Sequence, residues 1–168
     1  MINKNIEKVL NEQINKEMYS AYLYLSMSAY LSSINLNGFA HWTREQYIEE
    51  QEHALKLYDY VINRAGKVTL QPIDAVKTEW NGVIDVFEDI LAHERKITDS
   101  INNLVNIAYK ENDHATVNLL QWFVSEQVEE EASVSDILDQ LKLIDGKGSG
   151  LFMLDREAKA RTSGASEN

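Results

Sequence analysis

The sequence contains no cysteine and only one proline, and these shortages exclude whole classes of protein. Without cysteine there is no disulfide scaffold, no thiolate zinc site and no cysteine nucleophile. One proline and seven glycines are too few for the many turns of an all-β sandwich. The chain has no run of about 18 apolar residues, and its first residues lack the apolar core of a secretory signal. We therefore expect a soluble, cytoplasmic, mostly helical protein with no membrane partner.

Basic residues are also scarce. Lys and Arg total 16 against 27 Asp and Glu, which gives a formal net charge of −11. Binding to nucleic acids depends on clustered basic side chains, so this balance argues against a nucleic-acid partner. The length of 168 residues suits a single domain that buries about 70% of the surface of its unfolded chain.

Apolar residues recur at steps of three, four or seven in four long segments, which is the pattern of helices that each bury one face. These stripes run over residues 6–31, 39–60, 80–108 and 120–141. Gly66 is typical of a residue that ends the second helix. Asp113 is typical of an N-cap for the fourth helix.

The lengths of the connections predict the topology. The first and last connections are short, so the helices that they join are expected to be antiparallel. The middle connection, residues 66–80, spans roughly 50 Å when extended, whereas a helix of about 28 residues is about 42 Å long. It can therefore cross the whole bundle and leave the second and third helices parallel. We expect an all-α four-helix bundle over residues 1–160 with a short fifth helix at 151–159, and a disordered tail at 161–168.

Each apolar stripe is interrupted by polar residues close to the midpoint of its helix. Helices of similar length that pack side by side share their middle level, whichever way they point. The interrupting residues should therefore meet at one height inside the bundle; they are Glu17, Glu50, His53, Glu94, Gln127 and Glu130.

Carboxylates that converge inside a bundle need positive charge or protons. An unpartnered buried carboxylate costs several kcal/mol, and no Lys or Arg lies on the inward stripes at this level. Either the carboxyl groups are protonated or they hold cations, and a set of carboxylates with one imidazole suits iron or manganese. Glu50-x-x-His53 is the helix motif of ferritin-like di-iron and di-manganese proteins, in which other helices supply single glutamates. Glu17 and Glu94 fit that part.

The fourth helix departs from a symmetric site. It carries Gln127-x-x-Glu130 where a second Glu-x-x-His would stand, and an amide is a weaker ligand than an imidazole. One metal position should be tight and the other weak, which suits iron that passes through. A second acidic group, Glu49, Glu126, Glu129 and Glu130, could hold a further cation just outside the pair.

Each of these signals has a plainer interpretation. A single mid-helix glutamate is typical of a solvated position, and the acidic run 129–131 is typical of a solvated face. The interruption of four helices at one level nevertheless favours a metal site. His41, His93 and His114 are expected at surfaces or helix ends. Core packing explains Tyr24, although a hydrogen bond to a ligand or electron donation during oxidation fits equally well.

The segments that carry these residues resemble prokaryotic non-haem ferritins over about residues 1–160. The resemblance lies in residues 11–20, 49–53, 93–94 and 121–131. It implies a ferroxidase that oxidises Fe(II) with O2 or H2O2. It also implies a homo-oligomeric shell of 24 subunits that stores Fe(III) as mineral, with the fifth helix at the four-fold axes.

The resemblance also implies roles for individual residues. Glu17, Glu50 and His53 would bind the first iron. Glu94 would hold the second, with Glu50 bridging and Gln127 nearby, and Tyr24 would be the adjacent tyrosine. The third iron site of bacterial ferritins would correspond to Glu49, Glu126, Glu129 and Glu130.

Two departures from relatives bear on iron movement and on haem. Animal ferritins line their three-fold pores with acids early in the fourth helix, where this chain has Val117 and Leu120. That path for incoming iron is therefore not supported. Haem-binding ferritins carry a methionine in the second helix, where residues 49–52 read Glu-Glu-Gln-Glu, so no haem is expected.

Three other functions fit parts of the sequence. A di-iron or Mn/Fe oxidase or peroxidase without storage would take up about two metals per chain and no more. An acidic helical bundle that binds a partner protein would bind no metal tightly. A mini-ferritin that protects DNA is disfavoured because the chain has no basic tail and its ligands lie within one bundle.

Overall fold

The computed structural model describes residues 1–161, and within that part of the chain it contains helices and no strand. The helices are α1 (Lys4–Ser33), α2 (Asn37–Asn63), α3 (Val83–Lys110), α4 (His114–Leu143) and α5 (Gly148–Ala158). This confirms the predicted all-α bundle with a short C-terminal helix. Residues 162–168 of the predicted tail lie outside the described residues. No helix in the described range is long and apolar enough to span a membrane.

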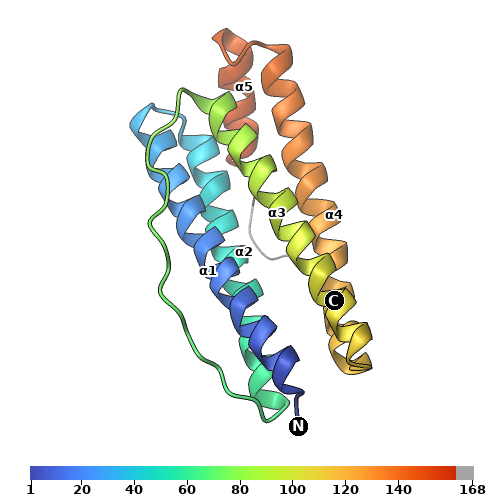
Figure 1. Ribbon diagram of the computed structural model, residues 1–168. Coiled ribbons are helices and arrows are strands. Elements are labelled where there is room, and N and C mark those ends of the chain that lie inside the picture. The colour runs from blue at the N-terminus through green and yellow to red at the C-terminus, as the bar shows by residue number, and fades with distance from the viewer. Residues whose placement is uncertain (162–168) are drawn as a thin grey trace.

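The middle connection crosses the bundle as predicted. Figure 1 shows it running along α1 from the end of α2 to the far end of the molecule, where α3 begins, so that α2 and α3 are parallel. Side chains of α1 hold it in place. Asn11 accepts a hydrogen bond from the Thr69 amide at 2.6 Å and donates one to the Lys67 carbonyl at 3.0 Å. Asn15 donates to the Pro72 carbonyl at 3.1 Å.

Two helix ends test the sequence-based expectations. Asp113 is the N-cap of α4, and its side chain accepts a hydrogen bond from the Thr116 amide at 3.1 Å, as predicted. The expectation for Gly66 is wrong in detail. Helix α2 ends at Asn63, and the residue in the left-handed conformation is Ala65, with φ of 55°. Gly66 follows it and donates its amide to the Val61 carbonyl.

The core consists of two apolar clusters rather than one. One cluster includes Leu23, Met27, Phe39, Phe87, Ile90 and Val134, and the other includes Ile14, Leu57, Ile97, Ile101, Leu120 and Phe123. Along α3 the clusters are separated by Glu94, which lies between Ile90 and Ile97 and is fully buried. The same break occurs on the other long helices, so a polar layer divides the bundle.

Helix α5 begins three residues earlier than predicted, at Gly148, and packs on the start of α2. No side chain caps the start of α2 from its own N-cap position. Instead Asp155 of α5 accepts hydrogen bonds from the amides of Gly38 and Phe39 at 2.9 and 3.0 Å. A Cβ on Gly38 would lie 1.5 Å from the Asp155 carbonyl oxygen, so only glycine permits this approach.

Candidate metal centre

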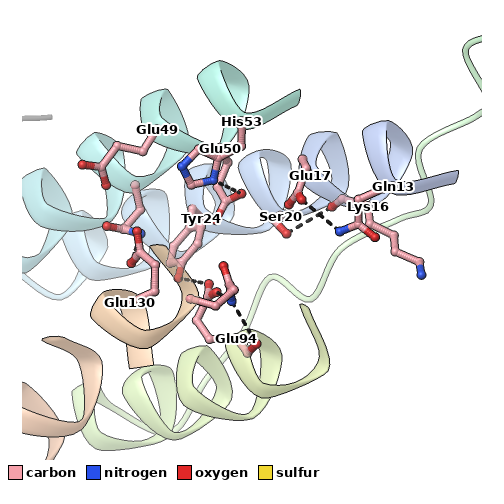
Figure 2. Close-up of polar contacts among 12 residues, drawn as sticks. Gln13, Lys16, Glu17, Ser20, Tyr24, Glu49, Glu50, His53, Glu94 and Glu130 are labelled. Atoms are coloured by element: carbon pink, nitrogen blue, oxygen red, sulfur yellow. Dashed lines mark hydrogen bonds and ion pairs between the residues drawn. The ribbon is translucent and has the colours of Figure 1, made fainter. Parts of the chain in front are cut away.

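The polar layer brings together all six residues that interrupt the apolar stripes. Their relative exposure is 7% or less: Glu17 1%, Glu50 2%, His53 6%, Glu94 0%, Gln127 5% and Glu130 7%. Each of the four long helices contributes one of the carboxyl groups, and Figure 2 shows those of α1, α2 and α3 directed toward one another. The prediction of a shared level inside the bundle is confirmed.

The closest group of potential metal ligands is formed by Glu17, Glu50 and His53. One ligand atom from each lies within 4.8 Å of the others, and all three side chains are buried. Glu50 and His53 are one helical turn apart on α2, which places Glu50 Oε2 3.5 Å from His53 Nδ1. The His53 ring packs edge-on against Trp122 and Phe123, with centroid distances of 5.4 and 5.9 Å. This packing fixes the orientation of the imidazole.

Glu94 enters the layer from α3 and is held by two hydrogen bonds. The Tyr24 hydroxyl donates to Glu94 Oε1 at 2.5 Å, and Gln127 Nε2 donates to Glu94 Oε2 at 3.1 Å. Of the interpretations left open for Tyr24, the structure therefore favours the hydrogen bond to a candidate ligand. Gln127 Nε2 also lies 3.3 Å from the Thr98 hydroxyl oxygen. Gln127 thus reaches the centre as a donor that positions Glu94.

Two buried glutamines that the sequence analysis did not single out support the other carboxyl groups. Gln13 Nε2 donates to Glu17 Oε1 at 2.9 Å, and Gln46 Nε2 donates to Glu130 Oε2 at 2.9 Å. Gln13 precedes Glu17 by four residues, so both lie on the same face of α1. Helical spacing alone could have identified Gln13, because it continues the buried stripe.

The electrostatic environment disfavours negative charge throughout the layer. Burial and the nearby Glu50 charge raise the pKa of Glu17 to about 8. Burial and Glu94 raise the pKa of Glu130 to about 7 and hold the pKa of Glu50 well above its usual range. Burial also raises the pKa of Glu94, although its hydrogen bonds from Tyr24 and Gln127 oppose the shift. The metal-free layer therefore retains protons near neutral pH.

The polar layer lacks positive charge, which a bound cation would supply. Within residues 1–161 no Lys or Arg forms an ion pair with these carboxyl groups, and Glu50 has only His53 within ion-pair distance. The Oε2 atoms of Glu17 and Glu50 are buried without a hydrogen-bond partner. An orphaned carboxylate oxygen on each of two helices, with an imidazole beside them, forms a donor set suited to Fe(II) or Mn(II).

The second acidic group, Glu49, Glu126, Glu129 and Glu130, is more exposed than the polar layer. Figure 2 shows Glu49 pointing away from Glu50 on α2. Glu126 is half-buried, Glu129 is exposed, and only Glu130 lies in the buried layer. The side chain next to Glu49 is a cation: Arg161 Nη2 donates to Glu49 Oε2 at 2.6 Å. The sequence analysis did not anticipate this contact, which joins residues 112 positions apart.

The remaining histidines lie away from the closest ligand group. His114 is exposed at the start of α4, as expected. His41 lies near the start of α2, and its Nε2 is 2.8 Å from the Arg161 carbonyl oxygen. His93 is half-buried, with Nε2 2.7 Å from the Ser20 hydroxyl, and burial lowers its pKa to about 4.

Comparison with known proteins gives one consistent family. The family of ferritin-like domains matches residues 7–144. The chain is 42% identical to a bacterial non-heme ferritin of Bacteroides fragilis over 161 residues, which cover 96% of this chain and 100% of that protein. It is 43% identical to the corresponding protein of Campylobacter jejuni over 95% of each chain.

A solved structure agrees with these relatives. The open-pore ferritin of the archaeon Archaeoglobus fulgidus superposes with a TM-score of 0.95 at 46% identity, covering 96% of this chain and 100% of that one. The fold and the sequence therefore agree. The chain has a long crossover, a short fifth helix and a buried carboxylate layer, and it is similar in sequence to these proteins over nearly its full length. The chain belongs to the ferritin family, among the prokaryotic non-haem ferritins.

Proposed function

We propose that this protein is an iron-storage ferritin that binds Fe(II) in the polar layer, oxidises it and stores Fe(III) as mineral inside an oligomeric shell. The observation that carries the proposal is the set of carboxyl groups from four helices, buried at one level with orphaned oxygens and no Lys or Arg partner within residues 1–161. The names of the relatives, bacterial non-heme ferritins, support the same function.

Two iron positions follow from the arrangement of donors. Glu17, Glu50 and His53 bind the first iron, since their ligand atoms already lie within 4.8 Å of one another. Glu94 binds the second iron, and Glu50 bridges the two positions. Gln127 lies beside the second position on α4 and donates a hydrogen bond to Glu94. Tyr24 positions Glu94 through its hydroxyl.

Binding of Fe(II) displaces protons from the layer, because the carboxyl groups retain them in the absence of metal. Two Fe(II) ions then give up one electron each. One O2 molecule that accepts both electrons and two protons is reduced to H2O2. One H2O2 molecule that accepts both electrons and two protons is reduced to two water molecules. The ionised carboxylates stabilise the Fe(III) product by charge.

The asymmetry of the centre favours release of the product. One position is bounded by His53 and two glutamates, whereas the other has an amide that donates its hydrogen bonds to Glu94 and Thr98. Iron at the weaker position can move toward the outer acids, Glu49, Glu126, Glu129 and Glu130, which form the third iron site. Hydrolysis of Fe(III) and its transfer to the cavity of the shell follow.

Several finer features belong to the same proposal. The chain is a single domain over residues 1–160, and it assembles as a homo-oligomer of 24 copies in the cytoplasm. It binds no haem, nucleic acid or membrane. Val117 and Leu120 are buried in the apolar core, 8% and 0% exposed, so they offer no acidic path for incoming iron in this part of α4.

Stopped-flow oxidation of Fe(II) tests the proposal. We expect Glu50→Ala and His53→Ala to lower the initial rate by roughly two orders of magnitude, because even outer partners of metal ligands contribute about 10- to 100-fold. Exposed Glu52→Ala on the same helix is the matched control and should oxidise iron at the wild-type rate. Circular dichroism verifies that each variant remains helical.

Size-exclusion chromatography with iron quantification separates storage from the alternatives. A large shell that accumulates many more than two iron ions per chain supports the proposal. A small oligomer that stops at two metals per chain would indicate a di-iron oxidase instead. Wild-type oxidation rates in both Glu50→Ala and His53→Ala would refute the assignment of the centre.

A further inference from the structure

Arg161 contacts Glu49, one of the four acids proposed for the third iron site. Its guanidinium Nη2 donates to Glu49 Oε2 at 2.6 Å, and the two side chains are only 20% and 18% exposed. One of the four acids assigned to the third site is thus already paired with a cation that belongs to the chain.

The position of Arg161 is built into the fold. Its guanidinium lies over the Trp42 ring, with Cζ 4.4 Å from the centroid, and its carbonyl oxygen is 2.8 Å from His41 Nε2. The preceding helix α5 is docked on α2, where Asp155 caps the amides of Gly38 and Phe39. The end of the described chain is therefore delivered to the outer acids by contacts to α2.

The contact is nevertheless incomplete. Arg161 Nη1 is buried without a hydrogen-bond partner, although a guanidinium offers five donors. Arg161 also lines a cavity of about 430 Å³ together with Trp42, Ile137 and Leu154. The side chain thus has one unsatisfied donor where it lies and open space beside it, so it can be displaced without unfolding its surroundings.

We propose that Arg161 is an internal counter-ion of the outer acids that competes with the third metal ion for Glu49. This inference rests on the proposed function. A metal ion that binds Glu49 shares the negative charge of that carboxylate with the guanidinium and is repelled by its positive charge, so the two cations compete. Arg161 therefore weakens the third site and returns to Glu49 when the metal leaves, which makes the site one of transit. The two inner positions do not depend on it.

Calorimetric titration with Zn²⁺ tests this inference without redox chemistry. The wild type, Arg161→Gln, Arg161→Lys and Arg156→Gln are compared, where Arg156 is an exposed arginine of the preceding helix α5. We expect Arg161→Gln to bind the third Zn²⁺ equivalent per chain about tenfold more tightly, as for loss of one charged hydrogen bond. Arg161→Lys and Arg156→Gln should behave as the wild type.

The double variant Glu49→Gln/Arg161→Gln identifies the residue for which the two cations compete. It should lose the gain seen in Arg161→Gln, because the shared carboxylate is absent. Equal affinity for the third equivalent in the wild type and Arg161→Gln would overturn the inference, as would an equal gain in Arg156→Gln. Failure of the proposed function would look different, since the first two equivalents would then bind weakly in every protein.

Discussion

The inner layer and the outer acids are neighbours that manage negative charge in opposite ways. The inner carboxyl groups are buried, and among residues 1–161 their hydrogen-bond donors are neutral side chains such as Gln13, Tyr24 and Gln127. The outer Glu49 is partly exposed and paired with Arg161. The inner layer must therefore hold protons or a bound metal ion. The outer Glu49 is paired with a cation of the chain itself, Arg161. Tight metal binding therefore requires a site without its own positive charge, and clustered acids alone are not sufficient.

The pH dependence of stability should distinguish the inner layer most strongly. The folded protein binds more protons than the unfolded chain, because the pKa of Glu17 is about 8 when folded against 4.5 normally. Stability is then fully present below pH 4.5 and is lost as pH rises through about 8. We expect the metal-free protein to lose several kcal/mol, since one pKa unit corresponds to about 1.4 kcal/mol. Urea unfolding at pH 5, 7 and 9 measures it.

The same titration has a built-in control. Glu17→Gln should flatten the fall between neutral and alkaline pH, because the variant has no proton to lose at that position. With saturating Zn²⁺ the trend should reverse, since protons no longer compete with the metal. Stability that is constant or rising with pH in the metal-free wild type would contradict the raised pKa values.

The inner Glu50 and the outer Glu49 should differ in their effect on the free energy of unfolding. At pH 9 we expect Glu50→Gln to raise the free energy of unfolding of the metal-free protein by about 1–3 kcal/mol, because it removes a buried, repelled carboxylate. The matched Glu49→Gln should lower it by less than about 1 kcal/mol, because it removes a partly exposed ion pair. Chemical unfolding of both variants without metal measures the difference. Equal effects would mean that the two groups share one environment.

A substitution at Gly38 of α2 tests the docking of α5 on α2. A Cβ on Gly38 would lie 1.5 Å from the Asp155 carbonyl oxygen, so Gly38→Ala should displace α5 at a cost of about 1–3 kcal/mol. Arg161 should then leave Glu49, and the third Zn²⁺ equivalent should tighten while the first two remain unchanged. Calorimetry measures all three. Loss of the inner sites in this variant would show that the two regions are not independent.

The smallest expected effect follows from loss of the hydrogen bond that Gln13 donates to Glu17. Gln13→Ala removes one neutral hydrogen bond and should weaken binding of the first metal by about fivefold, equivalent to about 1 kcal/mol. Because that bond lowers the pKa of Glu17, its loss should also shift metal binding to higher pH. Competition with a Zn²⁺-sensitive dye at several pH values measures both. Gln13→Glu removes the donor and adds a second negative charge beside Glu17, so it should raise the pKa of Glu17 further than Gln13→Ala does.

The inner layer was predictable because its cause is local. Helical periodicity places Glu17 and Glu94 on buried faces, and similar helix lengths bring them to one level. The crossover was predictable from its length alone. Gln13 is spaced four residues from Glu17 and so lies on the same buried face of α1.

The outer region could not be predicted in the same way. The contact between Arg161 and Glu49 depends on how α5 docks on α2, and no spacing within one helix encodes it. The start of α5 at Gly148 depends on a residue with φ of 68°, and Ala65 rather than Gly66 takes the left-handed conformation after α2. Tertiary packing decides the contact of Arg161 with Glu49, whereas the positive φ angles of Ala65 and Gly148 are local turn conformations that apolar periodicity does not reveal.

Anomalous diffraction at the iron edge, from crystals soaked anaerobically in ferrous salt, locates iron in the polar layer. We expect two iron peaks there, one bounded by Glu17, Glu50 and His53 and the other by Glu50 and Glu94. Iron found only at surface acids, with the inner side chains holding the same hydrogen bonds and no metal between them, would contradict this expectation.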